Sequence, residues 1–467
     1  MTNASDAKAS FRSDLQAALG TSGLVVDKDA MVPYCVDWRG EFGAPAVAVV
    51  RPKTVDQVSA VVRLCAAQGV AIVPQGGNTS LAGGSVPIAG QPQIVLNLSR
   101  MNAIRAVDPI GMTLTAEAGA VLETVQEAAQ AHNLLFPVSF AAQGSSQIGG
   151  VVSTNAGGIN VLRYGMTRQR VLGIEAVLAN GTIVNGLRRL HKDNAGYDWK
   201  HLLIGTEGTL GIVTAASLRL APRPRHRVTA LLAVPAPDAA LTLLRHATDE
   251  LGDAISGFEL ISPVALELVK QHFGLKPPLE LDSWGVLIEA VASLSGLRDG
   301  MEAALSAALE AGDATDGVIA ETETQAAALW ALREHVSEAE LKAGRSVKHD
   351  VSVPIDKIPA FINDATESLS GLFPDSQVVA FGHVGDGNVH FNVLGVAPED
   401  KAAVNRAVHD VVAGYHGSIS AEHGIGSYRV DELAHYKQTT QMALMRTIKQ
   451  ALDPRGLLNP GKIFGRT

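Results

Sequence analysis

Two histidines flank an Asp-Gly pair in the segment FGHVGDGNVHFNV (381–393), and both could bind a metal ion. Asp386-Gly387 between two apolar runs is typical of a two-residue, type I′ hairpin loop. In that register His383 faces His390 with Cβ atoms about 4.5–5.5 Å apart, and Asn392 follows on the same face. Two neutral imidazoles at this spacing are suitable ligands for a divalent cation. A lone histidine is more often an ordinary core or surface residue, so the prediction depends on the pairing.

A third ligand follows in SAEHGIG (420–426), where Glu422 offers a carboxylate. Three protein ligands leave coordination positions open for substrate or water, which is typical of a catalytic metal site rather than a structural one. His423, next in the chain, would remain available as a general base, because imidazole titrates close to neutral pH. Imidazole and carboxylate ligands suit zinc or manganese, and the sequence does not choose between them.

Two cations lie in the stretch from 329 to 354. Arg333 falls in a predicted amphipathic helix over 323–344, and Lys348 begins the strand predicted after it. Judged by spacing alone, each would be a solvated surface charge, since Lys and Arg side chains are mostly exposed.

Glycine accounts for 46 of the 467 residues, and its densest clusters lie in the first half of the chain. Glycine lets backbone N–H groups approach a diphosphate closely and adopts the positive φ angles that such loops need. One cluster would indicate only tight turns, but three clusters, two of them with interleaved Ser, Thr and Asn donors, favour a dinucleotide-binding surface. No Gly-x-Gly-x-x-Gly lies between a predicted strand and helix, and no Gly-x4-Gly-Lys-[Ser/Thr] occurs, which argues against nicotinamide-nucleotide and P-loop sites. The clusters are Gly76-Gly77 with Gly83-Gly84, Gly149-Gly150, and Gly157-Gly158.

The composition limits the class of protein. The net charge of −9, from 38 Lys+Arg and 47 Asp+Glu, disfavours a nucleic-acid partner. Cys35 and Cys65 are too few for a zinc ribbon or an iron–sulfur cluster, and each is expected to be a small buried apolar residue. No signal or transit peptide and no apolar run of about 18 residues is visible. We therefore expect a cytoplasmic protein without an integral membrane segment.

The elements that must position these side chains indicate an α+β protein of three parts. Glycine-rich loops alternate with strands and helices as far as APRPRHR (221–227), a Pro/Arg-rich joint. Beyond it, strands alternate with amphipathic helices in a β-α-β pattern, which predicts a ferredoxin-like antiparallel sheet. Glycine-containing loops return near the C-terminus. The predicted domains are 1–222, with an N-terminal helix, for dinucleotide binding; 223–415 for substrate and metal; and a C-terminal helical segment, 416–467.

Four segments resemble, in order and spacing, the flavin-binding domain of the vanillyl-alcohol-oxidase superfamily: PQGGNTSLAGGS (74–85), QGSSQIGGVVSTNAGG (143–158), GTEGTLGIVT (205–214) and NPGKIF (459–464). The resemblance implies an FAD-binding domain of two subdomains, with the C-terminal segment returning to the flavin site. The pyrophosphate would lie along Gly76 to Ser80 and the isoalloxazine near Gly144 to Gly158. Asn78 takes the place of the His that attaches FAD in some members, which implies non-covalent FAD. The cofactor-binding residues implied are Pro74, Gly76, Gly77, Asn78, Thr79, Ser80, Gly83, Gly84, Gly144, Ser145, Gly149, Gly150, Ser153, Asn155, Gly158, Ile212, Asn459 and Lys462.

Within that superfamily, residues 329–464 resemble the D-2-hydroxyacid dehydrogenase branch, and most closely the D-2-hydroxyglutarate dehydrogenases. The HxGDGNxHxN and EHGIG motifs of this branch match here without gaps. The site residues that the resemblance implies are His383, His390 and Glu422 as metal ligands, Asn392 and His423 as substrate contacts, Arg333 and Lys348 as holders of substrate carboxylates, and Ser337, where Thr is usual, near the distal end of the substrate.

These parts predict a dehydrogenase that depends on FAD and a divalent metal. It would oxidise a D-2-hydroxy acid to the 2-oxo acid by hydride transfer to flavin N5, with His423 taking the hydroxyl proton. Two cations favour a dicarboxylate, D-2-hydroxyglutarate or D-malate, over D-lactate or glycolate. Electrons would pass to an electron-transferring flavoprotein or a quinone rather than to oxygen, and a homodimer is expected. Two other functions stay open: a flavin reductase that uses NAD(P)H, and a non-enzymatic flavin electron carrier or metal-storage module.

Overall fold

The computed structural model describes residues 4–465, and the chain divides into two compact units. Unit 1 runs to Gly158, from Met166 to Arg223, and from His423 onward; unit 2 comprises 159–165 and 224–422. The division after Arg223 falls next to the predicted boundary. The second boundary falls after Glu422 rather than after residue 415, where it was predicted. Ser418 and Ser352 each donate a backbone hydrogen bond to the other, and this pair holds the segment before Glu422 in unit 2.

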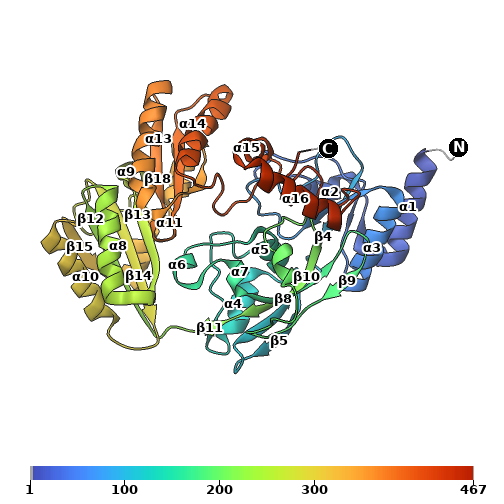
Figure 1. Ribbon diagram of the computed structural model, residues 1–467, viewed down its shortest axis with the longest axis horizontal. Coiled ribbons are helices and arrows are strands. Elements are labelled where there is room, and N and C mark those ends of the chain that lie inside the picture. Colours follow the sequence, from blue (N-terminus) through green and yellow to red (C-terminus); the bar gives the residue numbers. More distant parts are fainter. Residues whose placement is uncertain (1–3, 466–467) are drawn as a thin grey trace. The chain divides into compact units, whose positions relative to one another are not determined.

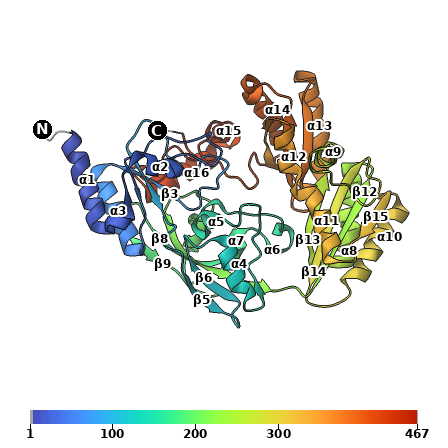
Figure 2. The ribbon, with the colours of Figure 1, turned by 180° about the vertical axis from the view of Figure 1, so that it is seen from behind.

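Unit 1 begins with a small sheet whose strands are mainly parallel. Its spatial order is β1 (Leu24–Val25), β2 (Ala48–Val50), β4 (Gln93–Asn97) and β3 (Ala71–Gln75), with β2, β4 and β3 parallel. Helices α1 (Ala4–Leu19) and α3 (Val55–Gln68) lie side by side at this sheet, as both views show (Figures 1 and 2). The hydroxyl of Thr54 caps α3, and Gly69 ends it in the left-handed conformation.

A second, antiparallel sheet completes the two-subdomain arrangement of unit 1. Its order is β5 (Ile104–Asp108), β6 (Thr113–Glu117), β10 (Ile212–Arg219), β8 (Val171–Val177) and β9 (Ile183–Asn185). Its core includes apolar residues of α4 (Leu122–Gln130) and α5 (Ile148–Thr154). The other regular elements of this unit are α2 (Lys28–Cys35), β7 (Leu134–Leu135), α7 (Thr167–Arg170), β11 (Ala221–Pro222), α15 (Val430–Tyr436) and α16 (Thr439–Leu452).

Unit 2 is built on one large antiparallel sheet. Its first part has the order β15 (Asp316–Ile319), β12 (His226–Val234), β14 (Trp284–Ala292) and β13 (Ile255–Ile261), which is the ferredoxin-like arrangement. The sheet continues from β13 through β18 (Gln377–His383) and β19 (Asn388–Leu394), which pairs with β16 (Ser346–Val347) and β17 (Asp350–Ser352). The predicted fold class is confirmed, and β18 and β19 extend the ferredoxin-like sheet.

Helices cover both faces of this sheet. α8 (Pro237–Leu251) and α10 (Leu297–Ala311) lie side by side (Figures 1 and 2). Apolar residues of α9 (Pro263–Phe273), α11 (Glu323–Glu334) and α12 (Val336–Ala343) share one core with β12, β13, β14 and β18. The predicted long helix 323–344 is two helices that meet at His335, which caps the end of α11 and the start of α12 and whose backbone angles (φ −80°, ψ −6°) stay in the right-handed helical region. The remaining helices are α6 (Val161–Tyr164), α13 (Ile358–Leu372) and α14 (Lys401–Gly414).

Candidate metal and flavin sites

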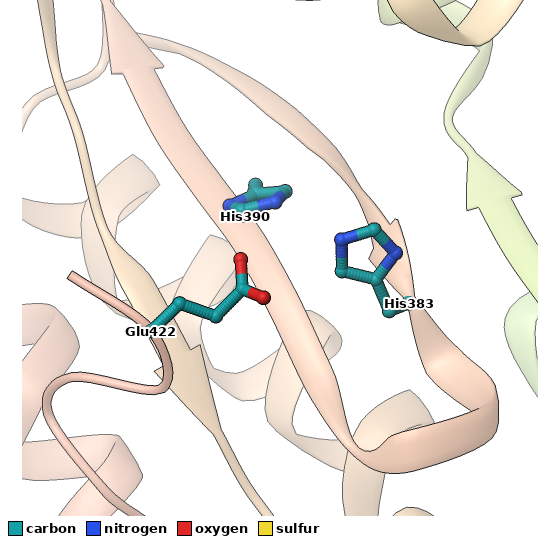
Figure 3. A group of neighbouring side chains, drawn as sticks. All are labelled: His383, His390 and Glu422. Atoms are coloured by element: carbon teal, nitrogen blue, oxygen red, sulfur yellow. The ribbon is translucent and has the colours of Figure 1, made fainter. Parts of the chain in front are cut away.

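The three predicted metal ligands come together in unit 2. His383 ends β18, His390 lies in β19, and Glu422 is the last residue of the unit. One potential ligand atom from each side chain lies within 4.8 Å of the others, and Figure 3 shows the three side chains converging. Two imidazole nitrogens and a carboxylate oxygen are a donor set suited to zinc or a similar divalent cation. These residues therefore fit a metal site.

The hairpin that carries the histidines has a register different from the predicted one. His390 pairs with Phe381 rather than with His383, and four residues, 384–387, form the loop. A type I′ loop requires positive φ at both central residues, whereas of this pair only Gly387 has one (φ 91°), and Asp386 belongs to a 3₁₀ turn. His383 lies diagonal to His390, with ring centroids 5.7 Å apart. The predicted register is wrong, but a shift of two residues keeps both imidazoles on one face.

A buried carboxylate that the sequence analysis missed supports His383. Glu259 in β13 pairs across the sheet with His383, and its Oε1 hydrogen-bonds the Nδ1 of that imidazole. Its Oε2 accepts a hydrogen bond of 2.6 Å from Arg333 Nε. Burial alone would raise the pKa of Glu259, but the charges of His383 and Arg333 outweigh burial and lower that pKa to about 2. The charged carboxylate favours positive charge at His383, which a proton or a metal ion supplies.

Asp350 supports the other two ligands. It lies in β17 opposite His390, with its Oδ1 3.9 Å from His390 Nδ1. Its Oδ2 accepts a hydrogen bond of 2.8 Å from the backbone N–H of Glu422, and its Oδ1 accepts one of 2.9 Å from Asn388 Nδ2. Asp350 therefore ties the backbone at Glu422 to the strand that carries His390. Burial raises the pKa of a further acid in the hairpin loop, Asp386, to about 7.

Two of the predicted substrate contacts of unit 2, Asn392 and Lys348, are engaged with other protein groups. Asn392 is buried; its Nδ2 donates to Glu340 at 2.7 Å, and its Oδ1 accepts from the backbone N–H of His349 at 3.2 Å. Lys348 Nζ pairs with the same Glu340 carboxylate at 3.3 Å. Ser337 is exposed in the first turn of α12. The substrate contacts of these three residues stay predictions, and Glu340 is a partner that the sequence analysis did not identify.

Arg333 differs from its expected place on the surface. Its side chain is buried, and its guanidinium carbon lies 4.7 Å from the ring centroid of Phe381. Among the described residues, Glu259 alone accepts a hydrogen bond from it. The prediction of a solvated charge is wrong for Arg333, because the α11 face that bears it packs on the sheet at β13.

The first two glycine clusters pack against each other in unit 1. A Cβ atom at Gly77 would lie 1.9 Å from the backbone oxygen of Ser145, a distance that no real side chain adopts. Next to this contact, the hydroxyl groups of Thr79 and Ser146 form a hydrogen bond of 2.9 Å. The two loops therefore approach at a separation that requires glycine at position 77, whether or not a cofactor is bound.

Other glycines in these clusters differ in what surrounds them. Gly149 and Gly158 are confined, because a Cβ atom would lie 2.8 Å from Ala118 Cβ and 2.0 Å from Ser139 O, respectively. At Gly150, by contrast, a Cβ atom would have no heavy atom within 4 Å. Gly150 therefore faces open space, whereas Gly149 and Gly158 are packed against protein. Open space at one glycine of the cluster is what a bound ligand would require, so the glycine loops fit FAD.

Polar side chains of the first loop shape the loop itself. Asn78 has a left-handed backbone (φ 54°), and its Nδ2 donates to Val36 O at 2.9 Å while its Oδ1 accepts from Ser85 Oγ at 2.8 Å. Ser80 Oγ accepts hydrogen bonds from the backbone N–H groups of Ala82 and Gly84. The side chains of Asn78 and Ser80 therefore orient the loop itself. The contacts expected for a pyrophosphate are then the backbone groups of the loop.

Glu207, another residue that the sequence analysis did not single out, holds the segment that follows His423. Its two carboxylate oxygens accept hydrogen bonds of 2.8 Å each from the backbone N–H groups of Ile425 and Gly426. Burial raises the pKa of Glu207, and these two hydrogen bonds partly oppose the rise. Two donors on one carboxylate fix the backbone close to His423, the first residue of the last segment of unit 1.

The C-terminal motif lies in the same unit. Asn459 donates to the backbone oxygens of Gly84 and Glu207 at 2.9 and 2.7 Å, and Lys462 Nζ donates to Val86 O at 2.8 Å. Burial lowers the pKa of Lys462 to about 8. Asn459 and Lys462 both belong to the predicted flavin set, and their contact with FAD stays a prediction. The other predicted flavin residues of unit 1 are Pro74, Gly76, Gly83, Gly144, Ser153, Asn155 and Ile212.

Together, the two subdomains with packed glycine loops define a flavin-binding domain, and unit 2 adds a metal-type ligand cluster. Comparison with protein families agrees: residues 46–186 match the FAD binding domain, and residues 223–463 match the C-terminal domain of FAD linked oxidases. The protein is an FAD-dependent oxidoreductase.

Comparison with individual proteins narrows the family. The chain is 40% identical over 457 residues to a D-2-hydroxyglutarate dehydrogenase of Xanthomonas citri pv. viticola, covering 96% of each chain. It is 38% identical over 451 residues to a mitochondrial D-2-hydroxyglutarate dehydrogenase of Arabidopsis thaliana, covering 96% of this chain and 80% of that protein. The chain belongs to the D-2-hydroxyglutarate dehydrogenase family of FAD-linked oxidases. The predicted family and enzyme class are confirmed.

Solved structures support the fold. A p-cresol methylhydroxylase with substrate bound superposes with a TM-score of 0.77 at 17% identity, covering 100% of this chain and 98% of that one. An alkyldihydroxyacetonephosphate synthase superposes with a TM-score of 0.75 at 18% identity, covering 97% and 85%. Within residues 4–465, none of the helices has the length and apolar character required to span a membrane.

Proposed function

We propose that the chain oxidises a D-2-hydroxy acid to the 2-oxo acid with the help of a divalent metal, and that D-2-hydroxyglutarate is its preferred substrate. The observation that carries the proposal is the cluster of His383, His390 and Glu422, whose ligand atoms lie within 4.8 Å of one another. Three protein ligands leave room for a bidentate ligand such as an α-hydroxy carboxylate. The substrate named for the relatives, which are 36–40% identical, supports this choice.

The residues divide the chemistry among them. When bound, a divalent metal supplies a Lewis acid that makes the C2 hydroxyl more acidic, and FAD supplies a hydride acceptor at N5. His423 takes the hydroxyl proton on a ring nitrogen as C2 loses hydride, so that the alcohol gives up two electrons and two hydrogens in total. His383, His390 and Glu422 would hold the metal.

Substrate choice depends on the second carboxylate. Lys348 is partly exposed, and its Nζ can reorient from Glu340, 3.3 Å away, toward a substrate carboxylate. We propose that a dicarboxylate, D-2-hydroxyglutarate or more weakly D-malate, is oxidised faster than D-lactate or glycolate. The test is a substrate panel with anaerobic bleaching of the flavin as the readout. A higher kcat/KM for D-lactate than for D-2-hydroxyglutarate would contradict the dicarboxylate preference.

Metal dependence is tested by removal and replacement. Dialysis against EDTA should abolish activity while FAD remains bound, and added zinc or manganese should restore it. The His390→Ala variant should bind FAD normally but show no recovery with either metal. Full activity of the dialysed protein, with no metal detected by mass spectrometry, would refute the metal role.

Three further features belong to the same proposal. The acceptor of the electrons is an electron-transferring flavoprotein or a quinone rather than oxygen, FAD is held without a covalent bond, and the protein acts in the cytoplasm as a homodimer. Rapid reduction of the bound flavin by NAD(P)H instead of a 2-hydroxy acid would favour the reductase alternative.

A further inference from the structure

Arg333, Glu259 and His383 form a continuous chain of contacts that ends at the metal cluster. Arg333 Nε donates to one oxygen of Glu259 at 2.6 Å, and the other oxygen hydrogen-bonds His383 Nδ1. Glu259 has no exposed surface, so water does not compete for either oxygen. The chain joins helix α11, strand β13 and strand β18, which the sheet register brings together.

The hydrogen bond decides which nitrogen of His383 can bind a metal. Because Glu259 occupies Nδ1, the available nitrogen is Nε2. Figure 3 shows one ring nitrogen of His383 directed toward His390 and Glu422 and the other on the opposite side of the ring. Metal-bound histidines commonly donate their second N–H to a carboxylate, which fixes the ring orientation and makes the ligand nitrogen more basic.

We propose that Glu259 and Arg333 are positioning residues for metal binding: Glu259 orients His383 toward the metal, and Arg333 holds Glu259 in place. This inference rests on the proposed metal site. This role is separate from the substrate-carboxylate contact that the resemblance implied for Arg333, which stays a prediction. A residue that only held substrate would not affect metal binding in the absence of substrate, whereas Arg333 acts on the empty enzyme through Glu259.

The sheet contains a matched carboxylate for comparison. Glu289 in the neighbouring strand β14 is buried, and it accepts a hydrogen bond of 2.9 Å from Trp330 of helix α11, which also carries Arg333. Glu289 thus shares with Glu259 the sheet, the burial and the helix that donates to it, but its cross-strand partners are Thr229 and Gly257 rather than His383. Replacing each carboxylate by an amide separates a general effect on the sheet from an effect on the metal ligand.

The experiment measures zinc affinity directly. Full-length protein containing FAD is stripped of metal and titrated with zinc against a competing chromogenic chelator, without substrate. We expect about one zinc per chain in the unsubstituted protein and none in His390→Ala. Glu259→Gln should bind zinc about 10- to 100-fold more weakly, the range typical for such partners of metal ligands. Glu289→Gln should bind within about twofold of the unsubstituted protein, with FAD content unchanged in all variants.

A second variant tests the role of Arg333. Arg333→Met keeps the apolar stem of the side chain and removes the donor to Glu259, so it should also weaken zinc binding by about tenfold. Unchanged zinc affinity in this variant would overturn the role assigned to Arg333. Unchanged affinity in Glu259→Gln would overturn the role of Glu259.

Two results separate failure of the inference from failure of the proposed metal site. If the unsubstituted protein binds zinc no better than His390→Ala, the metal site itself fails, and the inference with it. If Glu259→Gln does not fold, Glu259→Asp decides the question, because it keeps the charge but shortens the reach to His383 by one methylene group. Zinc affinity of Glu259→Asp equal to that of the unsubstituted protein would then overturn the inference.

Discussion

Replacement of Gly77 by alanine tests whether the contact between the two glycine loops is needed for the flavin site. The added Cβ would lie 1.9 Å from Ser145 O, so the loops must separate by at least about 1 Å to reach the shortest distances found for real side chains. Overpacking of this kind costs about 1–3 kcal/mol. The same movement stretches the 2.9 Å hydrogen bond between Thr79 and Ser146, which contributes about another 1 kcal/mol. We expect Gly77→Ala to lower the free energy of unfolding by about 2–4 kcal/mol and to weaken FAD binding at least tenfold.

Gly150→Ala is the matched control in the second loop. It lies in α5, where alanine is favoured over glycine by about 0.5–1 kcal/mol, and its Cβ has no heavy atom within 4 Å. The apoprotein should therefore become slightly more stable. If FAD lies against Gly150, as the resemblance implies, the same change should weaken FAD binding. Opposite effects on apoprotein stability and FAD affinity would show that this position is glycine because of the ligand.

The assay compares apoprotein and FAD-loaded protein for each variant. Thermal unfolding of the apoprotein gives the change in stability, and fluorescence titration with FAD gives the affinity. Wild-type stability and FAD affinity in Gly77→Ala would refute the argument from loop packing. Wild-type FAD affinity in Gly150→Ala would remove Gly150 from the predicted flavin contacts.

Three further predictions concern single side chains. His423→Ala should lower kcat at least 100-fold while FAD and metal remain bound, measured by single-turnover flavin reduction; near-normal turnover would refute its role as the base. Glu207→Gln should lower kcat with FAD content retained, because an amide places an NH₂ group against one of the two backbone N–H groups that follow His423, at a cost of about 1–3 kcal/mol. Glu175→Gln, a change at another buried acid of unit 1, is its control, and equal effects of the two changes would contradict a specific role for Glu207. Lys462 has a pKa of about 8 in the folded protein, below its value of about 10.4 in the unfolded chain. Between pH values of about 8 and 10.4 the unfolded chain binds more protons than the folded protein, so the free energy of unfolding should rise with pH in this range. Lys462→Met should show a smaller rise than the unsubstituted protein when unfolding is followed from pH 8 to pH 10; equal slopes would refute the shift.

The hairpin shows what local sequence signals can and cannot predict. The Asp-Gly pair correctly indicated a turn between two strands, and the paired histidines and following acid correctly indicated one cluster. The register was wrong because loop length depends on the backbone angles of Asp386 as well as on glycine, and Asp386 adopts a helical turn. The two histidines still lie on one face despite this error, because a shift by an even number of residues preserves the face.

The supporting carboxylates could not be found from the sequence. Glu259 is one acid within the apolar strand ISGFELI, and its partner His383 is 124 positions away in the chain. Nothing local indicates that these two residues are opposite each other, because their pairing depends on how β18 is added to the sheet. The glycine loops illustrate the same limit: their location was visible in the sequence, but whether Gly77 or Gly150 faces protein or ligand depends on packing between loops.

The pairing of β13 with β18 has a consequence for the order in which the protein folds. This pairing joins the ferredoxin-like strands to a hairpin more than 100 residues later in the chain, so its loop-closure entropy must be overcome before the contact of Glu259 with His383 exists. The hairpin histidines can form a local, weakly held pair earlier, without their buried support. During refolding, tight zinc binding at the proposed site should therefore appear only after β13 has paired with β18, later than the secondary structure of the four ferredoxin-like strands, so that zinc binding would report this long-range pairing.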